Sequence, residues 1–210
     1  MRVGKALQLV GGSLGSVGKM PGRSYSISAH ACITGSKLAS VPGSVCSGCY
    51  ALDRGNYQYN SVKTAHKRRL ASLTGPHWAA AMAFLLQHYK EKWFRWHDAG
   101  DLQSVEHLTK ICAVAALTPK TRHWLPTREL SIVQAYIAKG GSVPDNLTIR
   151  VSATMIDGRA TAKWPTVSLV HSKEPDSTAH VCPAPTQNNN CGKCRACWSK
   201  EIPCVTYHRH

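Results

Sequence analysis

The nine cysteines of this 210-residue chain fall into two groups near its two ends. Three lie early, at Cys32, Cys46 and Cys49, and Cys112 stands alone in the middle. The second group lies near the C-terminus and consists of Cys182, Cys191, Cys194, Cys197 and Cys204. Two groups of thiols around a cysteine-poor middle predict metal sites assembled from both ends of one domain.

The C-terminal group has the spacing of an iron–sulfur ligand set. Cys191, Cys194 and Cys197 form Cys-x-x-Cys-x-x-Cys, and three thiolates at this spacing wrap one face of a four-iron cubane. Bacterial ferredoxins add a remote fourth cysteine beside a proline. Cys182, which precedes a proline, or Cys204 would take that place. These residues predict a [4Fe–4S] cluster.

Zinc is the alternative metal, because structural zinc usually takes two separated Cys-x-x-Cys pairs. Cys46 and Cys49 would supply one pair and two tail cysteines the other. Disulfides or free thiols are a third interpretation. The chain has no apolar run long enough to span a membrane, and its first residues lack the apolar core of a signal peptide. We therefore expect a cytoplasmic protein, where thiols stay reduced.

The early group predicts a more reactive site. Cys46-Ser-Gly-Cys49 forms a clip of two thiols, and Cys32 offers a third sulfur. Three protein ligands on a four-iron cluster leave one iron open to a substrate or cofactor. Tyr50 directly follows this clip and is expected to shield the cofactor from water. Cys112 lies in an apolar helical pattern and is expected to pack in the core. One cluster and two clusters both remain open.

Strand patterns alternate with helix patterns through the middle of the chain, which predicts βαβ units and a mostly parallel sheet. Residues 1–22 are expected to form a loose leader rich in Gly and Ser. Residues 23–174 are expected to form the α/β core with its cysteine loop, and residues 175–210 a cysteine-rich tail packed on it. The expected strands are 24–28, 93–96, 123–125, 147–151 and 166–170, and the expected helices are 57–73, 77–90, 102–117 and 129–138.

Polar residues follow these strands, and in a parallel sheet such residues gather at one rim, where ligands bind. We expect His97 and Asp98 to bind a ligand or transfer protons. Asp101 is expected to cap the helix predicted from Leu102 and also to take part in the site. Arg128 is expected to hold a carboxylate or phosphate, with a solvated arginine as the alternative. The full rim set is His97, Asp98, Asp101, Thr127, Arg128, Ser152, Thr154 and His171.

The charge of the chain is strongly basic, with a formal net charge of +15. An excess of this size favours an anionic partner, and nucleic acid is the usual one. A solubilising surface without such a partner is the alternative. A basic run over Lys63, His66, Lys67, Arg68 and Arg69 would face phosphates or solvent from one broad side of a helix.

The motifs taken together resemble the tailed-phage "gene product eighty-eight" family over the chain from about residue 24 onward. The family is cysteine-rich, and the resemblance implies a phage origin without an assigned biochemical role. The motifs are 46–51, 95–101, 124–128, 150–152, 182–184, 191–198 and 207–210.

The order of elements also resembles the partial (β/α) barrel of radical S-adenosylmethionine enzymes. The resemblance implies that S-adenosylmethionine is a cofactor, with the turn at Asp101 near its amine and Ser152 near its ribose. The tail would then hold an auxiliary cluster. The superfamily's Cys-x-x-x-Cys-x-x-Cys motif is replaced here by a wider gap between Cys32 and Cys46. The sequence therefore predicts a redox or radical-type iron–sulfur enzyme. The alternative is a non-catalytic, metal-stapled basic module that binds nucleic acid or a host protein.

Overall fold

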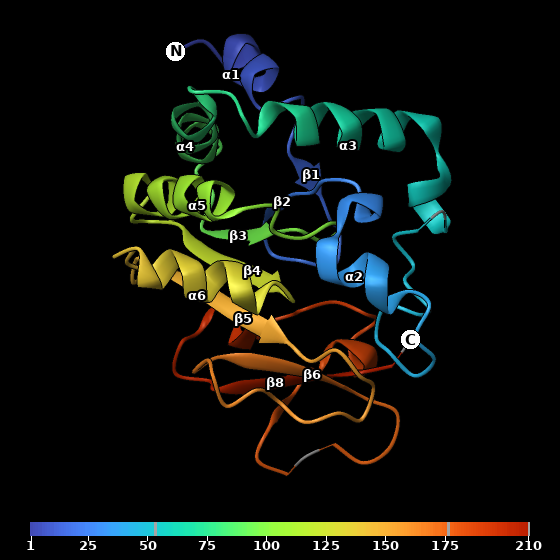
Figure 1. Ribbon diagram of the computed structural model, residues 1–210. Helices are drawn as coiled ribbons and strands as arrows, with labels where there is room; N and C mark the ends of the chain where they lie inside the picture. The colour runs from blue at the N-terminus through green and yellow to red at the C-terminus, as the bar shows by residue number, and fades with distance from the viewer. Residues whose placement is uncertain (53, 176, 210) are drawn as a thin grey trace.

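The protein is described by a computed structural model that covers residues 1–52, 54–175 and 177–209. Eight strands form one open sheet in the order β1-β2-β3-β4-β5-β6-β8-β7 (Figure 1). Neighbouring strands are parallel except for the antiparallel pair β1 and β2. The strands are β1 (Gly15–Ser16), β2 (Arg23–Tyr25), β3 (Trp93–Trp96), β4 (Arg122–Thr127), β5 (Leu147–Ser152), β6 (Val167–His171), β7 (His180–Val181) and β8 (Cys204–His208).

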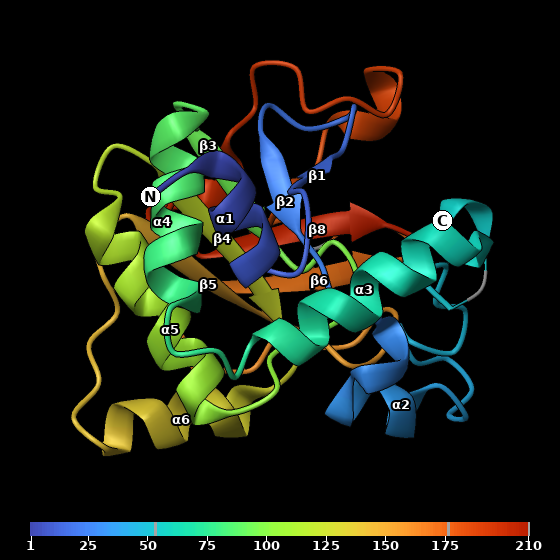
Figure 2. The same cartoon turned by 90° about the horizontal axis from the view of Figure 1, so that it is seen from above.

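The helices and the C-terminal tail cover opposite faces of this sheet. Figure 2 shows α4, α5 and α6 on one side and the tail, coloured orange to red, on the other. The α-helices are α1 (Val3–Leu9), α2 (Ile33–Leu38), α3 (Asn60–Ser72), α4 (Trp78–His88), α5 (Val105–Leu117) and α6 (Leu130–Ala138). Short 3₁₀ turns are η1 (Ala29–Ala31), η2 (Gly55–Gln58), η3 (Ala184–Thr186) and η4 (Ala196–Trp198). None of the described helices is both long and apolar enough to span a membrane.

The face of the sheet beneath the helices carries the main apolar core. Because successive side chains of a strand point to opposite faces, Phe94 and Trp96 of β3 both pack into this core, and so does Ile149 of β5. Trp78 of α4 is fully buried, with its ring centroid 5.9 Å from that of Trp96. Burial of each large apolar side chain contributes about 1.5–3 kcal/mol. The predicted placement of Cys112 in this core is confirmed, at 4% exposure.

The opposite face holds the tail through one buried arginine. Arg150 of β5 is 0% exposed, and its guanidinium donates to the backbone oxygens of Val167 in β6 and of four tail residues. The tail acceptors are Ala196, Cys197, Ser199 and Ile202. Thr148, on the same face of β5, donates to the Trp198 oxygen at 2.9 Å. Carbonyl groups of the tail thus find hydrogen-bond donors on the sheet.

The expectation of a loose leader over residues 1–22 is wrong. This segment contains α1 and β1, and Ala6 and Val10 are fully buried in the main core. Leu14 is buried as well, at 6% exposure. Apolar side chains spaced along a short helix thus outweigh the neighbouring glycines, because α1 packs against α4.

The cysteine-rich tail, residues 175–210, supplies two strands of the sheet, β7 and β8. β8 pairs in parallel with β6 and β7, and Val205 and Thr206 are buried. Residues 153–166, between β5 and β6, contain no helix, so the strand–helix alternation ends at β5. The mostly parallel α/β sheet predicted from the sequence is confirmed.

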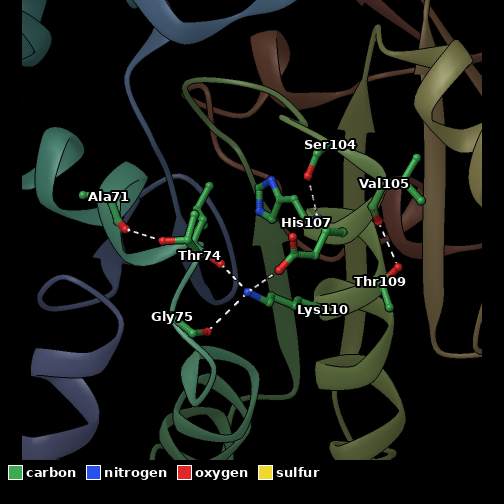
Figure 3. A network of polar contacts seen from close by, with 10 residues as sticks. Ala71, Thr74, Gly75, Ser104, Val105, His107, Thr109 and Lys110 are labelled. Carbon is green, nitrogen blue, oxygen red and sulfur yellow. Dashed lines mark hydrogen bonds and ion pairs between the residues drawn. The ribbon is translucent and has the colours of Figure 1, made fainter.

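The start of α5 differs from the prediction. The helix begins at Val105, and the Ser104 hydroxyl caps it by accepting the His107 N–H at 3.1 Å (Figure 3). Asp101 therefore does not cap this helix. Lys110 ties α5 to the loop after α3, because its ammonium donates to the Leu73 oxygen at 2.7 Å.

Arg150→Ala is expected to destabilise the protein by about 3 kcal/mol, because it leaves several buried carbonyl groups without donors. Equilibrium unfolding in urea measures the change. Arg122→Ala is the matched control, because Arg122 is exposed at the start of β4, and it should change stability by less than about 0.5 kcal/mol. Equal stability of the two variants would show that Arg150 does not hold the tail.

Candidate functional site

A cavity of about 660 Å³ lies at the carboxyl ends of the central strands, beneath the cysteine loop. Ligand sites of proteins commonly have volumes of this order. In Figure 1 the arrowheads of β4 and β5 point toward α2, which belongs to that loop. The cavity is lined by every residue proposed from the sequence for catalysis, cofactor binding and the early metal site: Cys32, Cys46, Cys49, Tyr50, His97, Asp98, Asp101, Arg128 and Ser152.

A buried carboxylate fixes the first part of the cysteine loop. Glu129 is 3% exposed and accepts the backbone N–H of Thr34 at 2.7 Å and its hydroxyl at 2.8 Å. The Gln103 amide donates to the Ala31 oxygen at 3.1 Å. These contacts hold Cys32, at the start of α2, over the ends of β3 and β4. Thr34 and Glu129 are far apart in the sequence, so the sequence gives no sign of this pairing.

Backbone pairing fixes the second part of the loop. The Val45 N–H donates to the Thr154 oxygen at 2.9 Å, and the Ile156 N–H donates to the Gly43 oxygen at 3.0 Å. Cys46 is therefore held above the end of β5. Thr154 was expected at the rim through its side chain, but it acts here through its backbone.

The early thiols face a shared space. The sulfurs of Cys32 and Cys46 each lie 3.6 Å from the point where a Cβ on Gly35 would stand, so a larger residue at Gly35 would fill the gap between them. Burial raises the pKa of Cys32 to about 12, with further contributions from Asp101 and the other early thiols. Such a thiol stays protonated unless a metal ion replaces its proton.

Arg128 places a positive charge beside these thiols. Its guanidinium lowers the pKa of both Cys32 and Cys46, against the larger effect of burial. Its Nε is buried and has no hydrogen-bond partner among the described residues. Arg128 is thus directed toward the cavity rather than into a protein ion pair.

Asp101 joins the end of β3 to the end of β4. Its carboxylate accepts the Thr127 hydroxyl at 2.5 Å, the Arg128 N–H at 2.8 Å and the Leu102 N–H at 2.7 Å. Burial raises its pKa to about 6, although these hydrogen bonds lower it. Asp101 therefore positions Arg128, and most of its acceptor capacity is used within the protein.

His97 is a buried residue of the cavity lining. It is 3% exposed, and neither ring nitrogen has a partner among the described residues. Its φ is +54°, a left-handed conformation that is costly for a residue other than glycine. Burial, then the neighbouring His107 and Arg95, lower its pKa well below 6.5. His97 is therefore a neutral imidazole, with one ring nitrogen able to accept a hydrogen bond and the other able to donate one.

Asp98 and Tyr50 lie toward the mouth of the cavity. The Tyr57 hydroxyl donates to the Asp98 carboxylate at 3.1 Å, and the Tyr50 hydroxyl donates to the Asp98 backbone oxygen at 3.3 Å. Tyr50 is 50% exposed. Tyr50 lines the cavity, and its role in shielding the early thiols stays a prediction.

The C-terminal thiols belong to the tail, which packs on the face of the sheet that carries Arg150. Cys182 interacts electrostatically with both Cys191 and Cys194, and also with Cys197. The Cys194 sulfur lies 3.4 Å from His180 Nε2, a neighbour that spacing did not indicate. Burial raises the pKa of Cys197 to about 11. These electrostatic interactions link the four cysteines, while their grouping around a metal remains a prediction.

Two residues connect the second thiol group with the cavity. Tyr207 lines the cavity, and its hydroxyl lies 3.2 Å from the Cys197 sulfur. Arg95 also lines the cavity, stacks over the Trp124 ring at 4.5 Å and raises the acidity of Cys197. Arg95 was not predicted as a site residue, although a charged side chain within the apolar strand Trp93–Trp96 is unusual and could have indicated it.

Two other predicted residues stand apart from the cavity lining. Cys204 begins β8, where it interacts electrostatically with Arg150. His171 was expected at the rim, but its Nδ1 lies 2.8 Å from the Thr206 hydroxyl at the sheet.

Ser152 lines the cavity and accepts a hydrogen bond from Ser168 at 3.0 Å.

Within the described residues, no group of three or more histidines, cysteines or carboxylates forms a site for a metal ion. The thiols of each group thus stand apart and are not closed around one centre. A single zinc ion would require four ligands at about 2.0–2.3 Å.

The Gene product 88 family model matches residues 5–200. The chain belongs to this family. The match confirms the predicted resemblance to the phage gene-product family and extends it toward the N-terminus. No curated protein and no solved structure matches the chain. The resemblance to radical S-adenosylmethionine enzymes gains no support from these comparisons and stays a prediction.

Asp101→Asn is expected to remove a pH dependence of stability. Because the folded pKa of about 6 lies above the ordinary value of 3.8, the unfolded chain loses this proton first as pH rises. Wild-type stability should therefore fall by about 2.4 kcal/mol between pH 4 and pH 7 relative to the variant. Urea unfolding at several pH values measures the difference. Asp145→Asn, at a fully exposed carboxylate, is the control. A difference between wild type and Asp101→Asn that does not vary with pH would contradict this account.

Proposed function

We propose that this Gene product 88 protein is an iron–sulfur enzyme. In this proposal Cys32, Cys46 and Cys49 hold a [4Fe–4S] cluster at the roof of the cavity. One observation carries it: three thiols from one loop line the same cavity as the charged residues at the strand ends. A purely structural metal site would not need to open into a cavity with those residues.

The residues of the roof fit a cluster in size and charge. Gly35 leaves free the space that the sulfurs of Cys32 and Cys46 face. A cubane is larger than a single ion, so its thiolates remain further apart than the ligands of zinc. Three thiolates on a core of charge about +2 leave a net charge of about −1. Arg128, which has no ion-pair partner among the described residues, would compensate this buried charge.

We extend the proposal to a second cluster at the tail, held by Cys182, Cys191, Cys194 and Cys197. Four thiolates would leave it at about −2, and Arg95 supplies positive charge next to Cys197. Tyr207 would lie between this site and the cavity.

The strand order favours a barrel-like scaffold. From β2 through β6 to β8 the parallel strands follow one another in chain order, which is the order of strands in (β/α) barrels. We therefore propose that the open sheet is a partial barrel whose active site lies at its carboxyl ends. The tail turn η4 would close the other end of the concave face through Arg150.

The side chains of the cavity have distinct tasks in this proposal. A cluster with one iron free of protein ligands supplies electron transfer and a binding position for a small molecule. His97 would hold or accept a proton at a ring nitrogen. Arg128 would bind an anionic group of the substrate, while Asp101 keeps the Arg128 backbone in place.

The test is an iron count on cysteine variants after anaerobic reconstitution. Replacing Cys32, Cys46 and Cys49 together by alanine should remove the iron of the roof site and leave that of the tail site. Replacing Cys191, Cys194 and Cys197 should have the converse effect.

Cys112→Ala is the matched control, because Cys112 is a buried core cysteine outside both groups. It should keep the full iron content of the wild type. Iron that survives both triple replacements would refute the ligand assignment. A protein that loads zinc and no iron would favour the non-catalytic, metal-stapled alternative.

S-adenosylmethionine is the first small molecule to test with the reconstituted protein. If it binds at the open iron, reduction should yield 5′-deoxyadenosine, detected by chromatography, and the roof variants should yield none. Full cluster loading without calorimetric binding of S-adenosylmethionine would exclude radical chemistry of this type.

A further inference from the structure

We propose that the mouth of the cavity binds single-stranded nucleic acid and that one nucleotide of the strand enters the cavity. The inference rests on the proposed function for its chemistry, since it names the substrate class of that site. It is carried by the charges and the aromatic ring at the mouth together with the groups inside.

The mouth is positively charged. Arg54, His208 and Arg209 are exposed and line the cavity. Arg54 precedes η2, whereas Arg209 directly follows β8, so the positive charge comes from two segments far apart in the sequence. No exposed carboxylate lies among the described residues that line the cavity. Phosphate groups are the anions that such an arrangement of arginines recognises.

Tyr50 offers a base a fixed aromatic surface. It is 50% exposed, and its hydroxyl bond to the Asp98 backbone holds the ring in place. Tyr57 supports it from one side, with ring centroids 5.8 Å apart. Exposed aromatic rings beside arginines are the usual stacking platform for unpaired bases, and stacking tolerates any base.

The interior matches the polar edge and phosphate of a single nucleotide. The cavity of about 660 Å³ admits a molecule of nucleotide size and not a duplex. His97 lines this cavity, and its two buried ring nitrogens have no hydrogen-bond partner among the described residues. Arg128 reaches the cavity without an ion-pair partner among the described residues. An imidazole and a guanidinium supply hydrogen bonds to a base edge and to a phosphate.

The strand has a path away from the mouth along α3. Arg54 precedes this helix, and Tyr59 and Lys67 are exposed at its start and further along it. The net charge of +15 attracts any polyanion to the molecule. We therefore expect the strand to lie along α3 and to enter the cavity at its mouth.

The experiment uses three fluorescein-labelled probes of 12 nucleotides: single-stranded RNA, single-stranded DNA and a DNA duplex. Fluorescence anisotropy measures the affinity of the protein for each probe at several salt concentrations. The reconstituted protein should bind at least one single strand more tightly than the duplex. Arg54→Ala combined with Arg209→Ala should reduce the slope of log affinity against log salt by about 1.4, for two lost phosphate contacts. Arg122→Ala, at the opposite end of the sheet, should leave the slope unchanged.

Variants of Tyr50 distinguish the contribution of base stacking from that of charge. Tyr50→Ala should weaken binding about tenfold, whereas Tyr50→Phe should keep it within about twofold because the ring remains. A strand carrying 5-iodouracil should crosslink on irradiation to a residue that lines the cavity. Equal affinity for duplex and single strand, an unchanged slope, or crosslinks confined to other surfaces would overturn the inference.

Iron is counted on the same samples, so the two proposals fail separately. Strand binding at the mouth by a protein without iron would refute the iron–sulfur assignment and keep this inference. Full iron content with affinity for free nucleoside phosphates and none for strands would refute this inference alone.

Discussion

The roof of the cavity depends on one contact between the cysteine loop and the segment between β4 and α6. Glu129 accepts both the backbone N–H and the hydroxyl of Thr34, and this pair fixes a loop that has little secondary structure of its own. Without it, Cys32 would have no defined position over the strand ends. The shape of the roof, and everything proposed to bind beneath it, depends on this contact and on the backbone pairing of Val45 with Thr154.

Successive side chains of each strand point to opposite faces of the sheet, so core residues and polar residues alternate along a strand. In β3, Phe94 and Trp96 pack under the helices, while Arg95 on the opposite face reaches the cavity. In β5, Ile149 joins the core and Arg150 anchors the tail. Buried arginines on an otherwise apolar face are costly unless their charge is met. The charge of Arg150 is met by backbone oxygens, whereas Arg95 stacks on Trp124 and interacts electrostatically with Asp98.

Regular patterns in the sequence predicted the regular part of the structure. The strand Trp93–Trp96 and the helices α4 and α6 follow from the periodicity of their apolar residues. The cavity-lining residues were found because polar side chains after parallel strands meet at one edge of the sheet. Even His97, in its strained conformation, lies where that rule places it.

The missed features depend on contacts between distant parts of the chain. Neither the clamp between Thr34 and Glu129 nor the parallel pairing of β8 with β6 leaves a local pattern. Asp101 was expected to cap a helix, but its carboxylate instead bonds the end of a neighbouring strand. The helix α1 was not predicted because it is short and lies in a glycine-rich segment. It is stabilised by packing against α4, which no local pattern indicates.

The central claim is that the early thiols hold an iron–sulfur cluster that opens into the cavity. The most direct measurement is the iron and acid-labile sulfide content of the anaerobically prepared protein, together with its electron paramagnetic resonance spectrum after reduction. The account predicts a brown protein with about four iron and four sulfide for each occupied site and the signal of a reduced [4Fe–4S] cluster. A colourless protein that carries zinc or no metal would contradict it.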